Sequence, residues 1–327
     1  MASIKRGINY LLHNRAQFCD SIVKNYLGWL PDKQYLSLRY RCQMGHWVDW
    51  KSPKTFSEKL QWLKVYDRKP AYTTMVDKYA VKKYVAERIG EEYIIPTLGV
   101  WDKTNDIDWD SLPEQFVLKT THGGGGSGVF ICKDKSSFNK TAVIEKINSS
   151  LSTDIYRCLR EWPYKDVPRR IIAEKFMAPV KNLPDYKIYG DKSLVNNDVI
   201  DAANLVYEEL KDYKFFCFNG SVKFFKVDFG RFVEHHANYY SVDGKLLGYG
   251  EKCFPPVPDA DIKLPDNLSE MIQLAERLAT GTSFLRVDLY NIHGKIYFGE
   301  LTLYPSSGFT PWTPSEADLE IGRLLRQ

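Results

Sequence analysis

The 327-residue sequence predicts an α+β fold class, with mixed α/β as the alternative. Helix-type patterns fill the segment before residue 90, and short runs rich in β-branched and aromatic residues follow it. Hairpin signals join some of these runs, which indicates antiparallel pairing rather than a regular βαβ array. Helices are expected between the runs, at 136–151, 152–161 and 266–280. The runs predicted to be strands are Tyr93–Ile95, Phe116–Leu118, Val129–Cys132, Ile171–Ala173, Phe215–Phe218, Val222–Val227, Phe284–Tyr290 and Ile296–Leu303.

The N-terminal part is predicted to be helical. Residues 4–50 mix apolar and basic side chains, and two interpretations stay open: a helical region packed on the domain, or an amphipathic helix on a membrane surface. Thr55 lies three residues before Glu58, which is the capping-box pattern, so a helix is expected to begin there and to end at Pro70. Another helix is expected over 77–89, where a glycine follows.

Composition narrows the class of protein. No uncharged apolar run approaches the ~18–20 residues of a membrane helix, and no signal peptide is expected. A net charge of +4 is not that of a dedicated nucleic-acid binder, so no nucleic-acid partner is expected. Six cysteines without a C-x-x-C pair suit reduced thiols in a cytoplasm. Aromatic residues make up 14%, which fits either a core of large rings or a sugar-facing cleft.

The strongest local motif is a glycine cluster between two predicted strands. Five of the 21 glycines lie within the six positions Gly123, Gly124, Gly125, Gly126, Ser127 and Gly128. A loop without Cβ atoms can bring its N–H groups close to phosphate oxygens, and Lys119 before it adds a positive charge. The Walker A pattern fails, a Rossmann loop would open a helix, and a kinase loop lacks its His-Arg-Asp partner. A flexible hairpin tip is the alternative to a phosphate-binding loop.

Two acidic residues near the C-terminus form the second motif. Alternation puts Arg286 and Asp288 on one face of a strand. A three-residue loop, Ile292–Gly294, is expected to close a hairpin that pairs Arg286 with Glu300 and Asp288 with Phe298. Asp288 and Glu300 are then diagonal neighbours on one face, which suits Mg²⁺ held between the protein and nucleotide phosphates. In the alternative interpretation, Arg286 neutralises Glu300 in a surface pair.

Three spaced basic residues and one strand end complete the set of candidates. Lys78 stands at a predicted helix start, Lys214 in an apolar strand and Arg231 after another strand, and each alone could be an ordinary surface residue. The strand that begins at Ile171 continues into Glu174–Met177, where the backbone could bind the edge of a purine. The alternative for that segment is an ordinary strand end.

In this order, the motifs resemble the ATP-grasp superfamily, and more narrowly the TupA-like ATP-grasp family of teichuronopeptide and other surface polysaccharides. The resemblance runs from about residue 35 to 320. The sequences that carry it are Pro53–Trp62, Val76–Tyr79, Phe116–Lys119, Asp212–Gly220, Arg286–Tyr290 and Phe298–Thr302. It implies an ATP-grasp fold with segments at 1–70 (N-terminal helices), 71–115 (pre-ATP-grasp), 116–177 (lid with the glycine-rich loop) and 178–327 (metal and acceptor site).

The resemblance also implies roles for individual residues. It implies Mg²⁺ ligation by Asp288 and Glu300, with Thr302 where many relatives have asparagine, which leaves one or two Mg²⁺ ions open. It implies that Lys214 and Arg231 face the transferred phosphate and the acceptor carboxylate. It implies contacts to ATP by Lys78, Lys119 and the loop Gly123–Gly128 at the phosphates, and by Glu174, Lys175, Phe176 and Met177 at the adenine.

The activity that the resemblance implies is an ATP-dependent carboxylate–amine ligase acting through an acyl phosphate. The expected substrates are an amino acid or amine and a uronic-acid carboxylate of a surface glycan, with the acceptor beside Tyr304–Phe309. The expected location is the cytoplasm, with peripheral association at the inner face of the membrane left open. A glycosyltransferase and an ATP-dependent sugar kinase are the alternatives.

Overall fold

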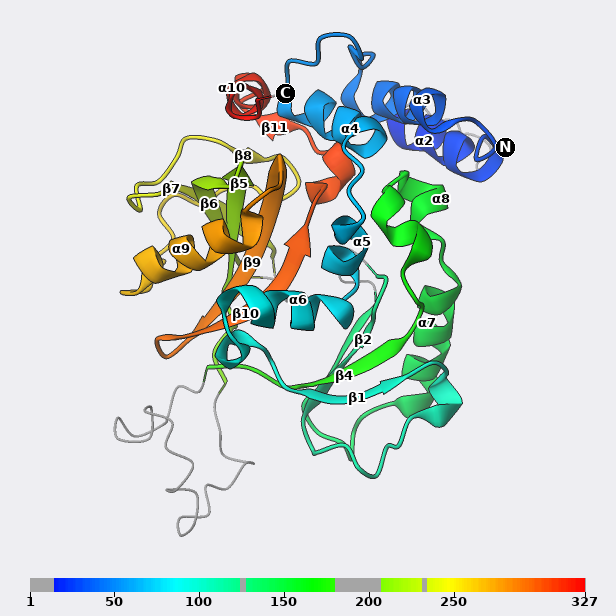
Figure 1. Ribbon diagram of the computed structural model, residues 1–327, viewed down its shortest axis with the longest axis vertical. Coiled ribbons are helices and arrows are strands. Elements are labelled where there is room, and N and C mark those ends of the chain that lie inside the picture. The colour runs from blue at the N-terminus through cyan, green and yellow to red at the C-terminus, as the bar shows by residue number, and fades with distance from the viewer. Residues whose placement is uncertain (1–14, 124–127, 180–206, 231–233, 327) are drawn as a thin grey trace, which may run out of the picture.

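The computed structural model describes residues 15–123, 128–179, 207–230 and 234–326. Antiparallel sheets and separate helices make an α+β fold, as the sequence predicts (Figure 1). The four-stranded sheet has the order β1 (Thr97–Trp101), β4 (Ile171–Lys175), β2 (Phe116–Thr120) and β3 (Val129–Cys132). The five-stranded sheet has the order β10 (Lys295–Thr302), β9 (Phe284–Ile292), β5 (Asp212–Phe218), β6 (Ser221–Phe229) and β7 (His236–Ser241). A short third sheet pairs β11 (Trp312–Thr313) with β8 (Gly250–Glu251).

Helices surround both large sheets. The α-helices are α2 (Arg15–Tyr26), α3 (Asp32–Met44), α4 (Phe56–Tyr66), α5 (Ala71–Val76), α6 (Ala80–Ile89), α7 (Lys140–Ser152), α8 (Ile155–Leu159), α9 (Leu268–Ala279) and α10 (Glu316–Leu324). The 3₁₀ helices are η1 (Glu91–Tyr93), η2 (Thr104–Asp106), η3 (Trp162–Asp166) and η7 (Pro305–Gly308). No helix in the described ranges combines the length and the apolar character that a membrane crossing requires.

The predicted capping box begins α4, and this helix packs against α10. The Thr55 side chain accepts from the backbone N–H of Glu58 at 3.2 Å, and the Glu58 carboxylate accepts from the N–H of Thr55 at 3.1 Å. Asp318 on α10 accepts from the N–H and the hydroxyl of Ser57. The Lys59 ammonium donates to two carbonyls at the C-terminal end of α10. The N-terminal helices therefore pack on the C-terminal part of the chain.

The five-stranded sheet contains the larger core. Helix α9 packs across β9, β5 and β6 on one face, and α6 packs against α9 (Figure 1). On the other face the apolar ends of the strands pack against α4 and β11, where Phe56 contacts Phe218, Phe284 and Trp312. The opposite end of that same face carries charged side chains, which form the site described below.

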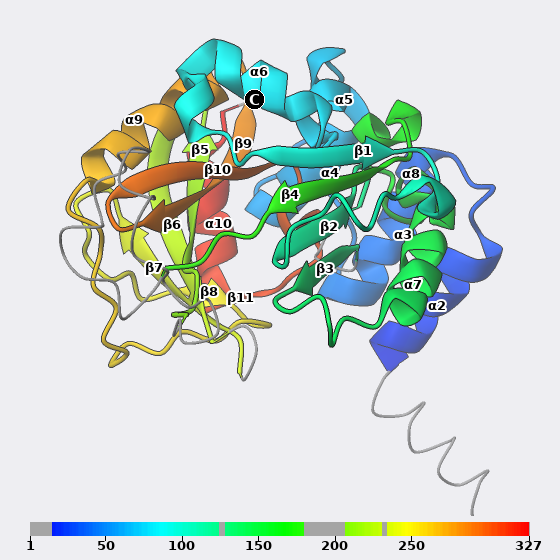
Figure 2. The ribbon, with the colours of Figure 1, turned by 90° about the horizontal axis from the view of Figure 1, so that it is seen from below.

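The four-stranded sheet has a separate, smaller core. Phe116, Leu118 and Ile147 are fully buried between this sheet and α7, and Trp109 and Phe138 pack beside them. Figure 2 shows the two sheets side by side, with α5 and α6 running along one side of both. The sheet begins at β1, ahead of residue 116, where the lid segment was predicted to start.

Two predicted elements differ in the structure. The predicted strand Tyr93–Ile95 is wrong: Tyr93 ends the 3₁₀ helix η1, and the strand lies further on, at β1. Pro96 follows this segment, and its carbonyl accepts from the N–H of Lys175, so pairing with β4 begins only there. The helical region over 4–50 contains two described helices, α2 and α3, separated near Pro31, which precedes the first residue of α3.

The turn between β9 and β10 is shorter than predicted. The predicted three-residue loop is wrong, because Ile292 pairs directly with Lys295 and leaves a two-residue turn. His293 and Gly294 both adopt positive φ, at 50° and 81°. Two successive left-handed residues make the tight hairpin turn that matches the twist of the strands. The left-handed conformation of Gly294 was expected, but nothing in the sequence predicted the left-handed conformation of His293.

A bulge at Gly299 then shifts the register of β10. Glu300 pairs with Asp288 and Thr302 with Arg286, so the predicted pairing of Arg286 with Glu300 is wrong. A Cβ atom at position 299 would lie 3.0 Å from the Asp288 carbonyl oxygen, which explains the glycine. The two acidic residues are therefore direct neighbours across the hairpin rather than diagonal ones.

Candidate active site

Lys78 connects the two large sheets. Its backbone N–H donates to the carbonyl of Thr121 at the end of β2, at 2.9 Å. Its ammonium lies 3.4 Å from Oε2 of Glu300 on β10. Asp77 fixes this turn, because its carboxylate accepts from the first N–H groups before α6 and from Arg170 at 3.1 Å. The Lys78 ammonium thus lies between the small sheet and the acidic pair of the large sheet.

Lys119 and Glu174 form an ion pair on the small sheet. Lys119 lies on β2 and pairs with Glu174 on β4, and Lys82 from α6 lies 2.5 Å from the other oxygen of Glu174. Burial opposes ionisation of Glu174, but Lys119 and Lys82 outweigh it and hold the pKa of this carboxyl below its usual value. Sequence reasoning placed Glu174 with the adenine-binding segment, and its side chain contacts Lys119, the lysine expected to bind phosphate.

The described ends of the glycine loop show why two glycines are needed. A Cβ at Gly123 would lie 2.6 Å, and one at Gly128 2.3 Å, from Oγ1 of Thr120. The N–H of Thr120 donates to the Gly128 carbonyl, so the loop begins and ends at the tip of β2. A larger residue at either position would require the Thr120 side chain to move. Residues 124–127 lie outside the described residues, and so does Arg231.

The segment expected to contact adenine follows β4. Lys175 is exposed and its backbone N–H donates to the carbonyl of Pro96. Phe176 packs edge-to-face against Tyr207, with ring centroids 5.4 Å apart, and Met177 is half-buried. This segment leaves the small sheet toward the large one, so the backbone here borders both.

Arg286 holds the acidic pair together. Its guanidinium forms two 2.7 Å bonds to Asp288 and one 3.0 Å bond to Glu300, and a further 3.0 Å bond to the Thr302 hydroxyl. At Asp288 burial has the larger effect and raises the pKa, although Arg286 and Lys214 oppose it. At Glu300 burial is outweighed by Lys78, Arg286 and Lys214, which hold its pKa well below the usual range. Glu300 is the more accessible of the two, with 37% of its side chain exposed.

Lys214 lies beside the acidic pair on β5. Its ammonium is 2.6 Å from Asp288, 2.5 Å from Asp212 and 3.9 Å from Asp228. Burial lowers the pKa of Lys214, but Asp212 and Asp288 outweigh it and raise the pKa above the usual value. The ammonium is therefore positively charged in a largely buried site, next to the acids of β9 and β10.

The donor atoms at this point fit magnesium. Asp288, Glu300 and Thr302 present carboxylate and hydroxyl oxygens, the hard ligands that Mg²⁺ prefers. Within the described ranges no three His, Cys, Asp or Glu side chains are grouped as a complete metal site.

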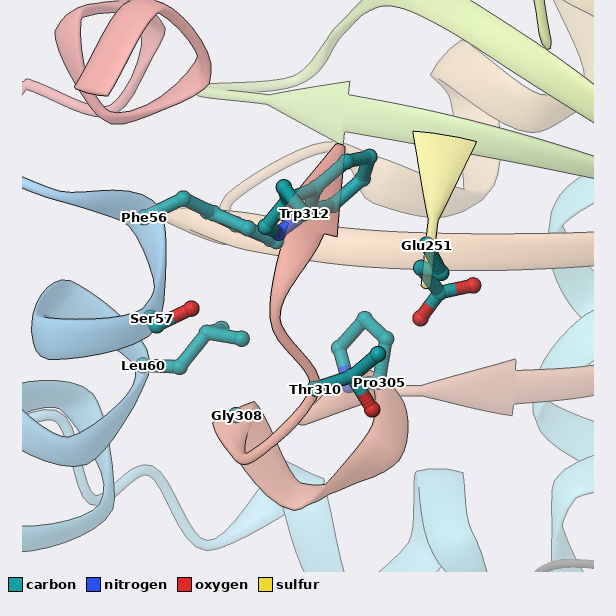
Figure 3. Close-up of a pocket in the computed structure, with 8 residues that line it drawn as sticks. All are labelled: Phe56, Ser57, Leu60, Glu251, Pro305, Gly308, Thr310 and Trp312. Carbon is teal, nitrogen blue, oxygen red and sulfur yellow. The ribbon is translucent and has the colours of Figure 1, made fainter. Parts of the chain in front are cut away.

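The charged network continues beyond the acidic pair. Lys226 on β6 lies 3.4 Å from Asp228 and 2.6 Å from Glu251 on β8. Glu251 also accepts from the hydroxyl of Ser306 at 2.9 Å and from that of Tyr239 at 2.8 Å. Because Ser306 follows β10, these contacts connect the loop after the acidic strand back to Lys214. Glu251 and that loop line a small cavity of about 10 Å³, with Phe56 and Trp312 on its other side (Figure 3).

The same loop contains two serines in a strained conformation. Ser306 and Ser307 have φ of 48° and 54°, in the left-handed region that non-glycine residues rarely adopt. The ammonium of Lys64 on α4 donates to the carbonyl and the hydroxyl of Ser307, at 2.8 and 2.7 Å. Gln61 donates to the carbonyls of Ser307 and Gly308. Burial lowers the pKa of Lys64, and neighbouring Glu161 opposes that shift.

Sequence reasoning missed several members of this network. Asp212, Lys226, Asp228 and Glu251 were not among the candidates, although all four are buried and charged. A signal was present, since pairs of charges two positions apart interrupt otherwise apolar strands, as in Lys226 and Asp228. Such spacing puts both charges on one face of a strand. Glu251 has no such partner and could not be found this way.

The comparison with family models assigns the chain to a family. The chain matches the model described as TupA-like ATPgrasp over residues 58–203 and 192–326. These matches span more than half of the sequence, so the chain belongs to the TupA-like ATP-grasp family.

Solved structures give more distant similarities. The chain is 12% identical to D-alanine–D-alanine ligase from Helicobacter pylori, with a TM-score of 0.40 over 83% of this chain and 69% of that one. It is 15% identical to the same enzyme from Bacillus anthracis in complex with ATP, with a TM-score of 0.40 over 77% of this chain and 62% of that one. It is 13% identical to N5-carboxyaminoimidazole synthetase from Staphylococcus aureus in complex with ADP, with a TM-score of 0.38 over 75% of this chain and 50% of that one. The chain thus spans half to about two thirds of these proteins. No curated protein matches the sequence.

Proposed function

We propose that the protein is an ATP-dependent carboxylate–amine ligase that joins an amino acid or amine to a uronic-acid carboxylate of a cell-surface polysaccharide. The observation that carries this proposal is the convergence of three cations, Lys78, Lys214 and Arg286, on the paired acids Asp288 and Glu300. Family membership supports the use of ATP. A phosphoryl group that enters between these groups would meet positive charge from two strands of the five-stranded sheet and from the turn before α6.

In the proposed reaction a carboxylate oxygen of the acceptor attacks the γ-phosphorus of ATP, and ADP leaves. The amine nitrogen then attacks the acyl carbon, phosphate leaves with the acyl–oxygen bonding pair, and the amine proton passes to solvent or phosphate. Lys119 and Lys78 hold the ATP phosphates, and Lys214 neutralises charge on the transferring group. Arg231 is proposed to face the acceptor carboxylate.

Asp288, Glu300 and Thr302 would hold Mg²⁺. Bound there, magnesium supplies charge neutralisation at the phosphate oxygens. Arg286 contacts all three side chains, so it keeps their oxygens together and balances their negative charge. The chain's own contribution at this point is a fixed cluster of oxygen ligands with one guanidinium behind it.

The acceptor is proposed to bind beside the loop Tyr304–Phe309. This loop follows the strand of Glu300 directly, and its left-handed serines are held from two sides by Lys64 and Glu251. Residues held in such a conformation cluster at sites that position a ligand.

The test is ATP turnover with a panel of uronic acids and amino acids, measuring ADP and free phosphate separately. A ligase releases both, and release depends on the amine as well as on the sugar acid. Glu300→Gln should abolish turnover; because its depressed pKa means that the charged Glu300 also stabilises the fold, thermal unfolding of the variant is measured alongside to show that it is folded. Asp288 is less suitable for this test, because its removal takes one carboxylate partner from each of two buried cations, Lys214 and Arg286.

Three outcomes would contradict the proposal. Full turnover in Glu300→Gln would contradict the metal assignment. ADP formation that needs a sugar, needs no amine and releases no phosphate would indicate a sugar kinase. Transfer from a nucleotide sugar without ATP would indicate a glycosyltransferase. Glu87→Gln serves as the matched control, since Glu87 is an exposed acid on α6 whose only close ion pair in the described part of the chain is to Lys83 at 3.9 Å.

A further inference from the structure

Helix α2 presents large apolar side chains to solvent. Phe18, Ile22 and Tyr26 are 46%, 40% and 73% exposed, and Trp29 just after the helix is 76% exposed. The first three are spaced by four residues, so they lie on one side of the helix. Phe18, Ile22, Tyr26 and Trp29 form an exposed strip, called here the α2 strip.

The α2 strip is not the face by which the helix packs on the molecule. Asp20 and Val23 are the buried residues of α2, and they point toward α3. The Asp20 carboxylate is held by Arg39 of α3 at 2.6 Å and by Lys24 at 2.7 Å. The helix is therefore already packed through another face, and it lies at the periphery of the molecule (Figures 1 and 2).

Basic residues accompany the α2 strip. Arg15 is exposed at the start of α2, whereas Lys24, which is 42% exposed, lies one turn after Asp20 and pairs with it at 2.7 Å. In the sequence before α2, Lys5 and Arg6 are also basic. Asp20 is the single acidic residue among the first 31, and its charge is buried and paired. The charge that this part of the chain offers to a partner is thus positive.

We propose that the α2 strip is a docking surface for an anionic phospholipid bilayer. Tryptophan and tyrosine are the side chains that settle at the headgroup level of membranes, and they are the two most exposed members of the strip. Phenylalanine and isoleucine add apolar area, and the exposed Arg15 at the start of the helix attracts anionic headgroups. A second protein chain fits less well, because stable interfaces use about 20–30 residues a side.

Flotation of the full chain with lipid vesicles tests this docking surface. Vesicles of phosphatidylcholine alone are compared with vesicles that contain about one third phosphatidylglycerol, in the absence of ATP and substrates. Binding to the anionic vesicles is expected, with loss of binding as salt rises, because exposed charges are screened within about 10 Å at 0.1 M ionic strength. The double substitution Ile22→Ser and Trp29→Ser should weaken binding by roughly tenfold or more.

Matched variants distinguish vesicle binding through the α2 strip from nonspecific adsorption of the protein to vesicles. Trp47→Ser changes a tryptophan that is 57% exposed but lies outside α2, and binding should be unchanged. Arg15→Glu should weaken binding, whereas Lys83→Glu on α6, where the lysine is 86% exposed, should not. All changed positions are exposed, so thermal unfolding should stay at the wild-type temperature.

Three results would overturn the docking surface. One is failure of the wild-type chain to float with anionic vesicles at low salt. Another is equal binding by wild type and the Ile22→Ser/Trp29→Ser variant. The third is a change of oligomeric state in that variant by light scattering, which would assign the strip to a second copy of the chain. None of these outcomes depends on ATP turnover, so they leave the ligase proposal untouched.

Discussion

Glu300 stands directly opposite Asp288 across the β9–β10 hairpin, and one residue, Gly299, makes this possible. The bulge at Gly299 changes the register by one residue and brings the two carboxylates to facing positions. Arg286 then reaches both carboxylates at once. The geometry of the candidate metal site therefore depends on a position that carries no side chain.

Gly299→Ala should reduce ATP turnover strongly while it changes the stability of the fold only slightly. The new Cβ would meet the Asp288 carbonyl oxygen at 3.0 Å and the Tyr290 ring at 3.2 Å, so the strands must move apart by a few tenths of an ångström. We expect ATP turnover to fall about tenfold, because small misplacements of reacting groups are costly, while the free energy of unfolding changes by about 1 kcal/mol or less. Activity and urea unfolding are measured on the same preparation.

Gly248→Ala is the matched control for that substitution. Gly248 has no heavy atom within 4 Å of the position that a Cβ would take, and its φ is not in the left-handed region. Turnover and stability should both stay near wild type. A Gly299→Ala protein with unchanged turnover would show that the facing position of Glu300 and Asp288 does not matter to the chemistry.

Local signals in the sequence were sufficient for part of this fold. The Thr55–Glu58 capping box begins α4 as predicted, since it depends on residues three apart. The strands Phe116–Leu118 and Val129–Cys132 around the glycine loop are also confirmed. These features are set by spacing within a few residues, which a single sequence displays.

The rest depended on contacts between segments far apart in the chain. The bulge at Gly299 and the left-handed His293 follow from strand pairing, and neither residue type alone indicates its conformation. The pairing of Lys214 with Asp288 joins residues 74 positions apart. Glu251 reaches Ser306 only because the short β8–β11 sheet brings them together. Such contacts become visible only in three dimensions.

Lys64→Met should destabilise the protein strongly. The Lys64 ammonium is fully buried and donates to Gln61, the Leu159 carbonyl and two oxygens of Ser307. Methionine fills similar volume but donates no hydrogen bond, so Gln61 Oε1, the Leu159 carbonyl and the Ser307 hydroxyl lose this donor, and the carbonyl of the strained Ser307 keeps its bond from Gln61. We expect a loss of about 3 kcal/mol in the free energy of unfolding, measured by urea denaturation.

Lys83→Met is the control for the buried lysine. Lys83 lies on α6 with 86% of its side chain exposed, so the free energy of unfolding should change by less than about 0.5 kcal/mol. If both variants unfolded at the same urea concentration as wild type, the hydrogen bonds of Lys64 would contribute nothing to the stability of the loop after β10.

The ion pair of Glu174 predicts a pH dependence of stability. Lys119 and Lys82 outweigh the effect of burial and hold the folded-state pKa of Glu174 below the unfolded value of 4.5. A carboxylate with a depressed pKa stabilises the fold fully above its unfolded pKa, and this contribution is lost as the pH falls through the folded pKa. The free energy of unfolding of wild type should therefore fall more steeply below about pH 4.5 than that of Glu174→Gln.

The measurement is urea unfolding between about pH 3 and pH 7, with Glu174→Gln compared to Glu87→Gln. Near neutral pH we expect Glu174→Gln to be less stable than wild type by about 2 kcal/mol, because the amide accepts more weakly from two ammonium groups. Glu87 is an exposed acid, so its replacement should leave the pH profile as in wild type. Parallel profiles for Glu174→Gln and wild type would contradict the depressed pKa.

ATP with Mg²⁺ should raise the unfolding temperature, and Lys119→Ala should remove that shift. A ligand that binds the folded state stabilises it by mass action, by about 2.7 kcal/mol at a hundredfold excess over its dissociation constant. Lys119 is 17% exposed at the end of β2, so its ammonium can reach a phosphate while it stays next to Glu174. Differential scanning fluorimetry with ATP, ADP and UDP-sugars measures the shift.

The variant must be compared with itself, because removal of Lys119 also affects Glu174. Glu174 keeps its contact with Lys82 at 2.5 Å, so the nucleotide-free variant should remain folded and give its own reference temperature. Lys83→Ala should keep the full shift, since Lys83 is exposed on α6. A shift with ATP–Mg²⁺ in wild type and Lys83→Ala, but not in Lys119→Ala, would assign the phosphates to the β2 lysine. An equal shift in Lys119→Ala would move the phosphate site elsewhere, and a shift only with a UDP-sugar would make glycosyl transfer the better hypothesis.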